Sequence, residues 1–254
     1  MNRQKIESLK KKALNLRIET FKAFIKKGEA HLGGSFSIIE TIIFLYNSFL
    51  NKNDKFILSK SHASFPLVLM LREKGFRTKL TTHLELDPKN GINCTTGSLG
   101  HGLPIATGMA FSQKIQNKKG RVFVMISDGE CQEGTTWESL LIANKLKLDN
   151  LIILIDYNKI QALTTLNDGL PLANLKSKLK SFNLNVVDIK NAHSFESLEK
   201  GFLKLKKNKK ANAIILNSIK GKGIKEFEND PVWHARQLHG KELSLGKKRL
   251  GIKI

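Results

Sequence analysis

Five short apolar runs along the chain predict buried strands. They cover residues 56–59, 122–127, 151–156, 186–189 and 213–217. Nearly every position in these runs is apolar, whereas a strand with one face in water would alternate between apolar and polar residues. Strands that are covered on both faces are typical of a parallel sheet between two layers of helices.

Segments with helical periodicity lie before and between these strands. They are expected at residues 5–27, 37–49, 67–74, 99–115, 136–147 and 195–207. Gly28 and Gly75 follow two of the segments, at the place where glycine commonly ends a helix. Ser37 and Glu40 have the spacing of a capping box, which predicts that the second helix begins at Ser37.

The alternation of strands and helices predicts the α/β fold class, with an open parallel sheet flanked by helices on both faces. No internal repeat and no low-complexity linker divides the 254 residues. We therefore expect a single domain over residues 1–254, with a basic C-terminal tail from about residue 244.

Composition excludes several classes of protein. No apolar run approaches the roughly 20 residues of a membrane span, and no apolar stretch of the kind found in secretory signals follows the basic N-terminus. Cys94 and Cys131 lie far apart in sequence, which suits neither a disulfide framework nor a metal-ligand motif. These features favour a reducing cytoplasm as the location.

The formal net charge of +21 would suit a nucleic-acid-binding protein. However, the lysines are scattered over the predicted helical faces, without interleaved aromatic residues or a recognisable nucleic-acid motif. Nucleic acid is therefore not the expected partner. A basic surface also suits an acidic protein or anionic substrates.

Polar side chains follow two of the predicted strands. Asp128 and Gly129 come directly after one strand, and Asn158 follows the next. In an open parallel sheet, ligands gather beyond the carboxyl ends of the strands, so these residues can converge if the strands are neighbours. A carboxylate, an amide oxygen and a backbone carbonyl form a hard ligand set for Mg²⁺ or Ca²⁺ that diphosphate oxygens could complete. Gly129 would let its N–H approach a phosphate.

This arrangement resembles the thiamin-diphosphate fingerprint, in which Gly-Asp-Gly after one strand is followed by Asn after the next. Here Ser127 replaces the first glycine, outside the coordinating positions. Six blocks in family order are similar to transketolases, and in particular to the separate N-terminal subunit of split transketolases. They read GEAHLGGSFSIIE (28–40), DKFILSKSHAS (54–64), TTGSLGHGLPIATGMA (95–110), SDGECQEGTTWES (127–139), DYNKIQ (156–161) and KGKGIKEFENDPVWH (220–234).

The resemblance implies roles for individual residues. The metal ligands would be Asp128, Asn158 and the backbone carbonyl of Ile160. The cofactor-binding positions would be His62, Gly97, Leu99, Gly129, Glu130, Asn158 and His234, with Gly97 and Leu99 lining the aminopyrimidine pocket. The catalytic histidines would be His31, His62, His83 and His234, of which His83 has the weakest match because its surrounding motif, Thr-His-Leu-Glu, departs from the family pattern.

Other basic residues are expected to be structural or solvated. His193 and His239 fall in none of the six blocks, and His101 stands where relatives often have glutamine. Lys220 and Lys222 could face a phosphate, but a solvated loop is the expected environment.

The resemblance also implies the reaction and the partner. A transketolase uses thiamin diphosphate and a divalent metal to move a two-carbon ketol unit from a ketose, commonly a phosphate, to an aldose. Imidazoles suit this chemistry because sugar hydroxyls must lose and regain protons near neutral pH. The glutamate that activates the cofactor belongs to a pyrimidine-binding domain, which we expect on a companion chain, in a heterotetramer with two copies of each chain.

Two alternatives remain open from the residues. The chain could be the α subunit of a thiamin-diphosphate-dependent 2-oxo acid dehydrogenase, although the blocks around His31, His62 and residues 95–102 favour a transketolase. It could instead be a non-catalytic binding protein that uses its basic surface, although the presence of Asp128, Asn158 and the histidines argues against this.

Overall fold

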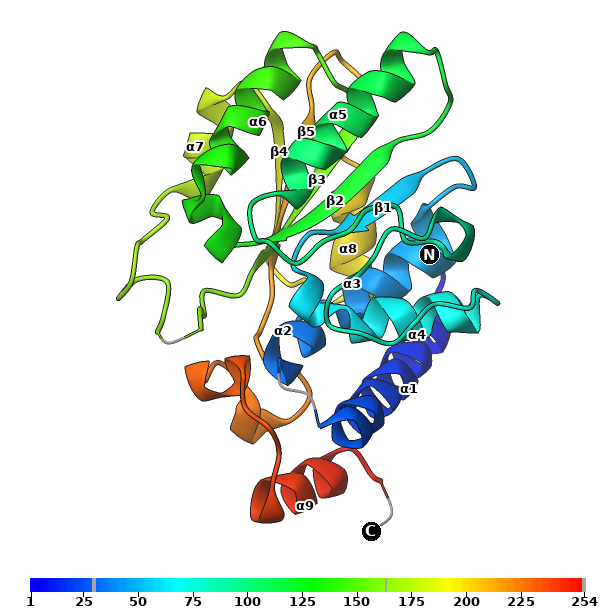
Figure 1. Cartoon of the computed structure of the whole chain (residues 1–254), viewed down its shortest axis with the longest axis vertical. Coiled ribbons are helices and arrows are strands. Elements are labelled where there is room, and N and C mark those ends of the chain that lie inside the picture. The colour runs from blue at the N-terminus through cyan, green and yellow to red at the C-terminus, as the bar shows by residue number, and fades with distance from the viewer. Residues whose placement is uncertain (29–30, 163, 253–254) are drawn as a thin grey trace.

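The computed structural model describes residues 1–28, 31–162 and 164–252. Five strands form one sheet in the order β1-β2-β3-β5-β4 (Figure 1). The strands are β1 (Lys55–Leu58), β2 (Val122–Ser127), β3 (Leu151–Tyr157), β4 (Asn185–Ile189) and β5 (Asn212–Asn217). Every pair of neighbours is parallel. The fold class expected from the sequence is confirmed, and each strand lies within one residue of its expected bounds.

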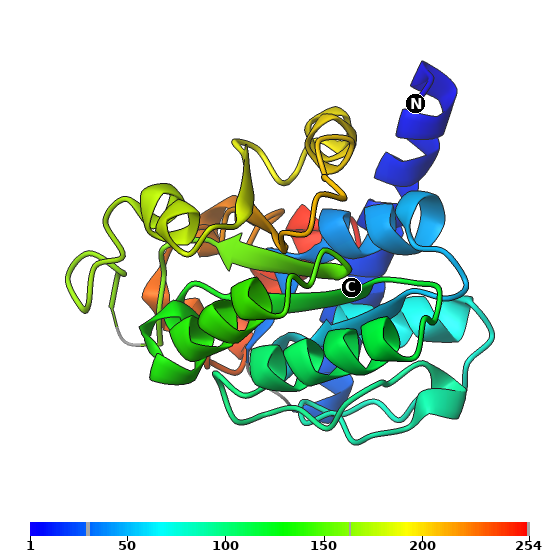
Figure 2. The same ribbon diagram turned by 90° about the horizontal axis from the view of Figure 1, so that it is seen from above.

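Helices cover both faces of the sheet, as Figure 2 shows from above. The α-helices are α1 (Arg3–Lys27), α2 (Leu32–Phe36), α3 (Ile39–Phe44), α4 (Phe65–Glu73), α5 (Gly102–Ile115), α6 (Gly134–Lys145), α7 (Leu175–Ser181), α8 (Phe195–Phe202) and α9 (Gly240–Arg249). A π-helical turn spans Leu45–Phe49, and short 3₁₀ turns occur at Ser61–Ala63, Pro88–Asn90, Gly129–Gln132, Lys225–Phe227 and Pro231–His234.

Alternate residues of each strand enter two separate cores. In β2, Phe123 and Met125 join a core with residues of α1, α3, α4 and α8. Val122, Val124 and Ile126 point to the other face, where they join residues of α5, α6 and α7. All five side chains are at most 1% exposed. This double burial is the physical reason that the strands appear in the sequence as continuous apolar runs.

The first helix ends as its sequence predicts, but the second does not begin as expected. Gly28 caps α1 with φ = 64°, a backbone conformation that glycine adopts without steric cost. Ser37 caps no helix, because its hydroxyl donates to the Gly34 carbonyl at 2.9 Å and to Asp156 Oδ2 at 2.7 Å. The capping-box prediction is therefore wrong: the side chain that suggested a helix start binds a buried carboxylate across the fold.

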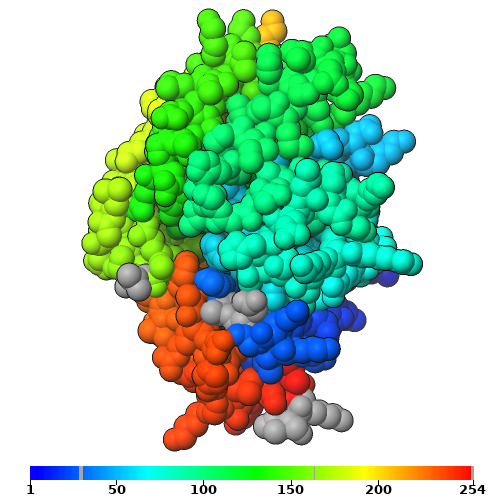
Figure 3. Space-filling model, in the orientation of Figure 1, coloured from blue at the N-terminus to red at the C-terminus, as the bar shows by residue number. Residues whose placement is uncertain are grey.

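Two further segments differ from the expected elements. The helix expected over residues 195–207 ends at Phe202, and α7, which is rich in lysine, was not expected. Most of the segment expected as a basic tail forms α9, in which Gly246 lies so close to Phe21 of α1 that an added Cβ would collide with its ring. Figure 3 shows this C-terminal segment, in orange and red, against the N-terminal residues in blue.

In the described part of the chain, no helix combines the length and the apolar character that crossing a membrane requires.

Candidate active site

The loops after β2 and β3 meet at one edge of the sheet. The register pairs Ser127 with Asp156, so Asp128 and Asn158 emerge side by side. Asp128 Oδ2 accepts a hydrogen bond from the Lys159 main-chain N–H at 2.5 Å, and its Oδ1 accepts one from the Gly129 N–H at 2.9 Å. These two bonds fix the orientation of the carboxylate.

Asp128 is a buried carboxylate, with only 2% of its surface exposed. Burial raises its pKa, the neighbouring Asp156 raises it further, and the value reaches about 6. Within the described residues, no side-chain cation forms an ion pair with Asp128. The site thus holds a fixed carboxylate whose charge is not neutralised by a direct contact.

Asn158 and Ile160 add further oxygens beside Asp128. Asn158 Oδ1 accepts the Ile160 N–H at 3.0 Å, and its Nδ2 donates to Asp156 Oδ2 at 3.0 Å, which fixes the amide orientation. The Ile160 carbonyl accepts a hydrogen bond from Lys220 Nζ at 2.9 Å. Residues 1–28, 31–162 and 164–252 contain no group of three or more His, Cys, Asp or Glu side chains arranged to hold a metal.

Behind these residues lies a buried ion pair between Lys60 and Asp156, both 1% exposed, with Nζ 2.5 Å from Oδ2. Lys60 also donates to the Gly34 carbonyl at 3.0 Å, and Ser218 donates to Asp156 Oδ1. Burial alone would raise the pKa of Asp156, but the Lys60 ammonium and the hydrogen bonds lower it below its usual value. The network joins the ends of β1, β3 and β5 to α2.

Three of the candidate histidines form a cluster. The ring centroids of His31 and His62 are 5.4 Å apart, those of His31 and His234 are 5.6 Å apart, and those of His62 and His234 are 5.4 Å apart. The backbone of His31 lies in the left-handed region, with φ = 68°, which costs a residue with a Cβ roughly 1 kcal/mol. Strained backbone of this kind concentrates at functional sites.

The environment keeps two of these imidazoles neutral. Burial, and then the charge of Lys60, hold the pKa of His62 well below its usual range. Burial, and then the charge of Lys220, lower the pKa of His234 to about 3. Near neutral pH, both rings can therefore accept a proton or a hydrogen bond.

Lys220 is not in a solvated loop, so that prediction is wrong. Its side chain is buried, and Nζ lies 2.6 Å from His234 Nδ1 as well as contacting the Ile160 carbonyl. Burial, and then Lys60, lower its pKa to about 7. The Gly221 N–H donates to the Gly33 carbonyl at 3.0 Å, which anchors this loop to α2. Lys222, by contrast, is one-third exposed and pairs with Glu228.

The site opens into a cavity of about 410 Å³. Of the candidate residues, its lining includes His62, Leu99, Asp128, Gly129, Asn158, Ile160 and His234. His83 and Gly97 are not part of the lining. The exposed His83 ring lies over Gly97, where an added Cβ would come within 2.7 Å of its Cδ2.

Glu130, a candidate cofactor-binding residue, faces the protein interior. Its Oε1 accepts the Gly100 N–H at 3.0 Å and the Ser59 hydroxyl, and its Oε2 accepts the Ser127 N–H at 2.7 Å. The side chain is fully buried. Glu130 therefore joins the loop after β2 to the segment that carries Leu99.

A second buried triad orients the loop that carries Ser218 and Lys220. His193 Nε2 accepts the Ile219 N–H at 2.8 Å, so Nδ1 must carry the proton, and Nδ1 lies 2.8 Å from Glu40 Oε2. Arg17 donates to the other Glu40 oxygen at 2.7 Å. The structural role expected for His193 is confirmed.

Several residues of the site were not found from the sequence. Lys60, Asp156, Gln132, Gln161 and Thr164 are among them. The signal for Lys60 was available, because a lysine at the end of an apolar strand, two residues before His62, needs a buried partner. Gln132 and Gln161 carried no such signal, since a polar residue in a loop is ordinary.

Comparisons with known proteins agree with this geometry. The family described as "Transketolase, thiamine diphosphate binding domain" matches residues 9–254. One of the two subunits of an apulose-4-phosphate transketolase from Actinobacillus succinogenes is 32% identical over 262 residues, covering 95% of this chain and 94% of that protein. A 6-deoxy-6-sulfo-D-fructose transketolase subunit of Clostridium sp. (strain MSTE9) is 32% identical over 260 residues, covering 94% of each.

Longer transketolases match over part of their length. Human transketolase is 31% identical, and the match covers 93% of this chain and 41% of that protein. The crystal structure of the Campylobacter jejuni transketolase superposes with a TM-score of 0.85 at 27% identity, covering 99% of this chain and 43% of that one. The chain therefore belongs to the transketolase family, and it corresponds to the thiamine diphosphate binding domain of these enzymes.

Proposed function

We propose that the chain is the N-terminal subunit of a two-chain transketolase, folded as one diphosphate-binding domain. With thiamin diphosphate and a divalent metal, it would transfer a two-carbon ketol unit from a ketose, commonly a phosphate, to an aldose. The observation that carries this proposal is the meeting of the His31, His62 and His234 cluster with Asp128 and Asn158 at one edge of the sheet. The end-to-end match to relatives named as transketolase subunits supports it.

The residues present fit a magnesium or calcium ion. Asp128 offers a buried carboxylate that lacks an ion-pair partner among the described residues, and Asn158 Oδ1 and the Ile160 carbonyl add neutral oxygens. One carboxylate alone binds Mg²⁺ weakly, but Mg²⁺ is commonly held by one or two carboxylates together with phosphate oxygens. We therefore assign the three residues as ligands that act together with a diphosphate.

The cationic and polar groups around the cavity suit the diphosphate itself. Lys220 brings a positive charge, and His62 and His234 offer ring nitrogens from two sides. Gly129 adds a main-chain N–H with no Cβ to keep a phosphate at a distance. Glu130 would act by holding the Gly129 loop in position, because both its oxygens are engaged inside the protein.

When bound, thiamin diphosphate supplies the carbanion-stabilising chemistry that splits a carbon–carbon bond next to a carbonyl. The protein's part is to bind the sugar and to move its protons. We assign His31, His62 and His234 to the sugar hydroxyls, because neutral imidazoles can take up a proton at Nδ1 or Nε2 and return it. Leu99, with Gly97, would form part of the apolar wall around the aminopyrimidine, and His83 is assigned to the outer substrate path.

The remainder of the active site would come from a companion chain with the pyrimidine-binding domain, in a heterotetramer with two copies of each chain. The chain spans 41% of human transketolase, so the companion would supply the rest. Helices α5 and α6, which lie side by side in Figure 1, expose large apolar side chains suited to such a partner. They are Ile105, Phe111, Ile115, Leu141 and Ile142, each between 37% and 61% exposed. We place the complex in the cytoplasm.

The test of the reaction class uses the complex of this chain with the protein encoded beside it. Ketol transfer from a ketose phosphate to an aldose, measured with thiamin diphosphate and Mg²⁺, should be robust, and decarboxylation of 2-oxo acids should be at background. The reverse pattern would assign the chain to the 2-oxo acid dehydrogenases. Salt-dependent DNA binding with no thiamin-diphosphate binding would favour a non-catalytic protein.

A further inference from the structure

A second cavity lies at the opposite edge of the sheet from the candidate active site. Its lining comes from the loops that precede β1, β2, β3 and β5, whereas Asp128 and Asn158 follow β2 and β3. The volume is about 770 Å³, compared with about 410 Å³ at the active site. Small-molecule sites commonly measure about 300–1,000 Å³. Ketol transfer gives this cavity no role.

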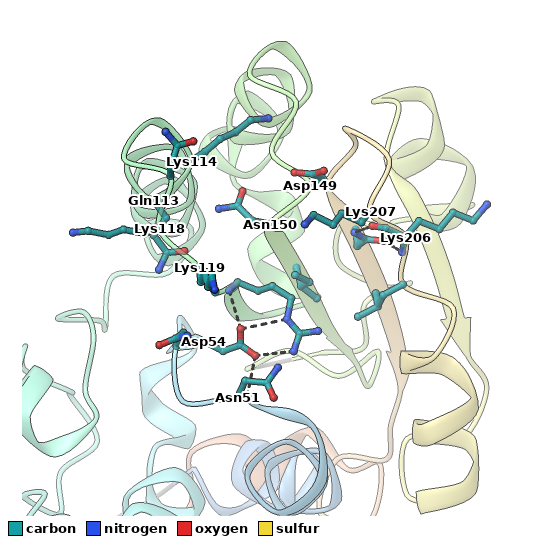
Figure 4. Close-up of a pocket in the computed structure, with 17 residues that line it drawn as sticks. Asn51, Asp54, Gln113, Lys114, Lys118, Lys119, Asp149, Asn150, Lys206 and Lys207 are labelled. Atoms are coloured by element: carbon teal, nitrogen blue, oxygen red, sulfur yellow. Dashed lines mark hydrogen bonds and ion pairs between the residues drawn. The ribbon is translucent and has the colours of Figure 1, made fainter.

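The cavity is strongly cationic. Its lining includes Lys114, Lys118, Lys119, Arg121, Lys206 and Lys207, against two carboxylates, Asp54 and Asp149. Arg121 and Asp54 neutralise each other, with Nη2 2.7 Å from Oδ2, as the dashed lines in Figure 4 show. Lys114 donates to the carbonyls of Leu146 and Lys147.

The other four lysines of the lining have no such engagement. Over the described ranges, no carboxylate forms an ion pair with Lys118, Lys119, Lys206 or Lys207. All four are exposed. Asp149 accepts the Lys209 N–H at 3.4 Å, which leaves it the one carboxylate facing these lysines in the described lining. The cavity therefore attracts anions.

Two amide oxygens in the lining point to a specific ligand and not only to counterions. Gln113 is 7% exposed, and in the described structure its Oε1 accepts no hydrogen bond. Asn150 donates from Nδ2 to the Ala110 carbonyl at 2.9 Å, so its orientation is fixed, and its Oδ1 is likewise without a donor among the described residues. In Figure 4, Asn150 lies between the helix that carries Gln113 and the segment that carries Lys206 and Lys207.

We propose that this cavity binds a nucleoside oligophosphate, whose phosphates contact the lysines and whose hydroxyl or amino groups donate to Gln113 and Asn150. A buried acceptor that stays unsatisfied costs more than a satisfied one, so a ligand with donors gains affinity over a bare phosphate chain. Lysine suits phosphate as a mobile point charge. The proposal is independent of the transferase activity.

The test is titration of the purified full chain with ATP by calorimetry at about 0.15 M salt, where purely surface attraction is screened. Saturable binding of one ATP per chain is expected. Replacing Lys119 and Lys207 by alanine together should weaken binding at least about tenfold, because each charged hydrogen bond contributes ~1.5 kcal/mol or more. The matched control, Lys176→Ala with Lys180→Ala on α7, removes the same charge outside the cavity and should change affinity less than about twofold. Equal losses in the two variants, or no saturable binding, would overturn the proposal.

Two further measurements identify the ligand groups and the place. Gln113→Met should weaken binding of ATP but not of inorganic tripolyphosphate, which carries no nucleoside donors. Equal effects on both would contradict the role of the amide oxygen. Hydrogen exchange with ATP should protect residues 113–121 and 205–212. Protection at residues 127–134 and 220–234 instead would place ATP in the active site and overturn the proposal.

Discussion

The main-chain N–H of Lys159 donates to Asp128 Oδ2 across 2.5 Å. This single bond ties the loop after β3 to the first residue after β2, and it brings Asn158 and the Ile160 carbonyl beside the Asp128 carboxylate. The proposed metal ligands are thus held by main-chain contacts before any metal binds. Their arrangement follows from the sheet order and does not depend on flexible side chains.

Removing the charge at Asp128 should weaken cofactor binding without unfolding the chain. Asparagine keeps an oxygen for the Lys159 N–H but cannot supply a negative ligand. We expect Asp128→Asn and Asn158→Ala each to weaken Mg²⁺-dependent binding of thiamin diphosphate at least about tenfold in the assembled complex, measured by calorimetry. Glu19→Gln on α1 removes an exposed carboxylate and serves as the control. Unchanged affinity in both site variants would rule out the proposed metal site.

The histidine cluster should matter more for turnover than for folding. His31→Ala and His234→Ala should each lower kcat about a hundredfold, the usual size of a general acid–base contribution. Thermal melting should change little, because both side chains are only half-buried. His239→Ala, which alters an exposed histidine at the start of α9, is the control. Near wild-type rates for the two cluster variants would show that their assigned roles are wrong.

The Lys60–Asp156 pair should be essential for stability. Lys60→Met leaves Asp156 buried without its cation, which should cost about 3–5 kcal/mol in the free energy of unfolding. Adding Asp156→Asn removes the stranded charge and should recover part of that loss. The exposed pair of Lys190 and Asp188 is the comparison, since Lys190→Met should cost less than about 1 kcal/mol. Denaturant unfolding measures all three, and a double variant no more stable than Lys60→Met would contradict the explanation.

Glu40 should make stability depend on acid pH. Burial would raise its pKa, but Arg17 and His193 outweigh burial and lower it from 4.5 to about 2. A depressed carboxyl pKa stabilises the fold fully above the ordinary value, and the stability is lost as the pH falls through 2. The advantage over Glu40→Gln should therefore shrink by on the order of 3 kcal/mol between pH 5 and pH 2. A difference that is flat or grows on acidification would contradict this assignment.

The strands could be predicted because burial on both faces leaves a direct trace in the sequence, as in Phe123 and Val124 of β2. The residues after β2 and β3 could be placed at one edge for the same reason. Ser37 could not be interpreted correctly, because its partner Asp156 lies 119 positions away along the chain. A capping serine and a serine that binds a distant carboxylate look the same locally.

Lys220 shows the same limit within the site. Its glycine-rich, lysine-rich surroundings are typical of a solvated loop, and only the anchoring of Gly221 to Gly33 buries it. In contrast, the roles suggested for His31, His62 and His234 needed the family blocks, since no periodicity distinguishes them from surface histidines. Their clustering is a property of tertiary structure alone.

The most direct test of the central proposal is activity of the chain alone and with its companion. Ketol transfer from a ketose phosphate to an aldose is assayed with thiamin diphosphate and Mg²⁺, first for the purified chain and then after mixing with the protein encoded beside it. We predict no turnover by the chain alone, and turnover on mixing, with co-elution at a mass near two copies of each chain. Robust turnover by the chain alone would contradict the proposal that it supplies only part of the active site.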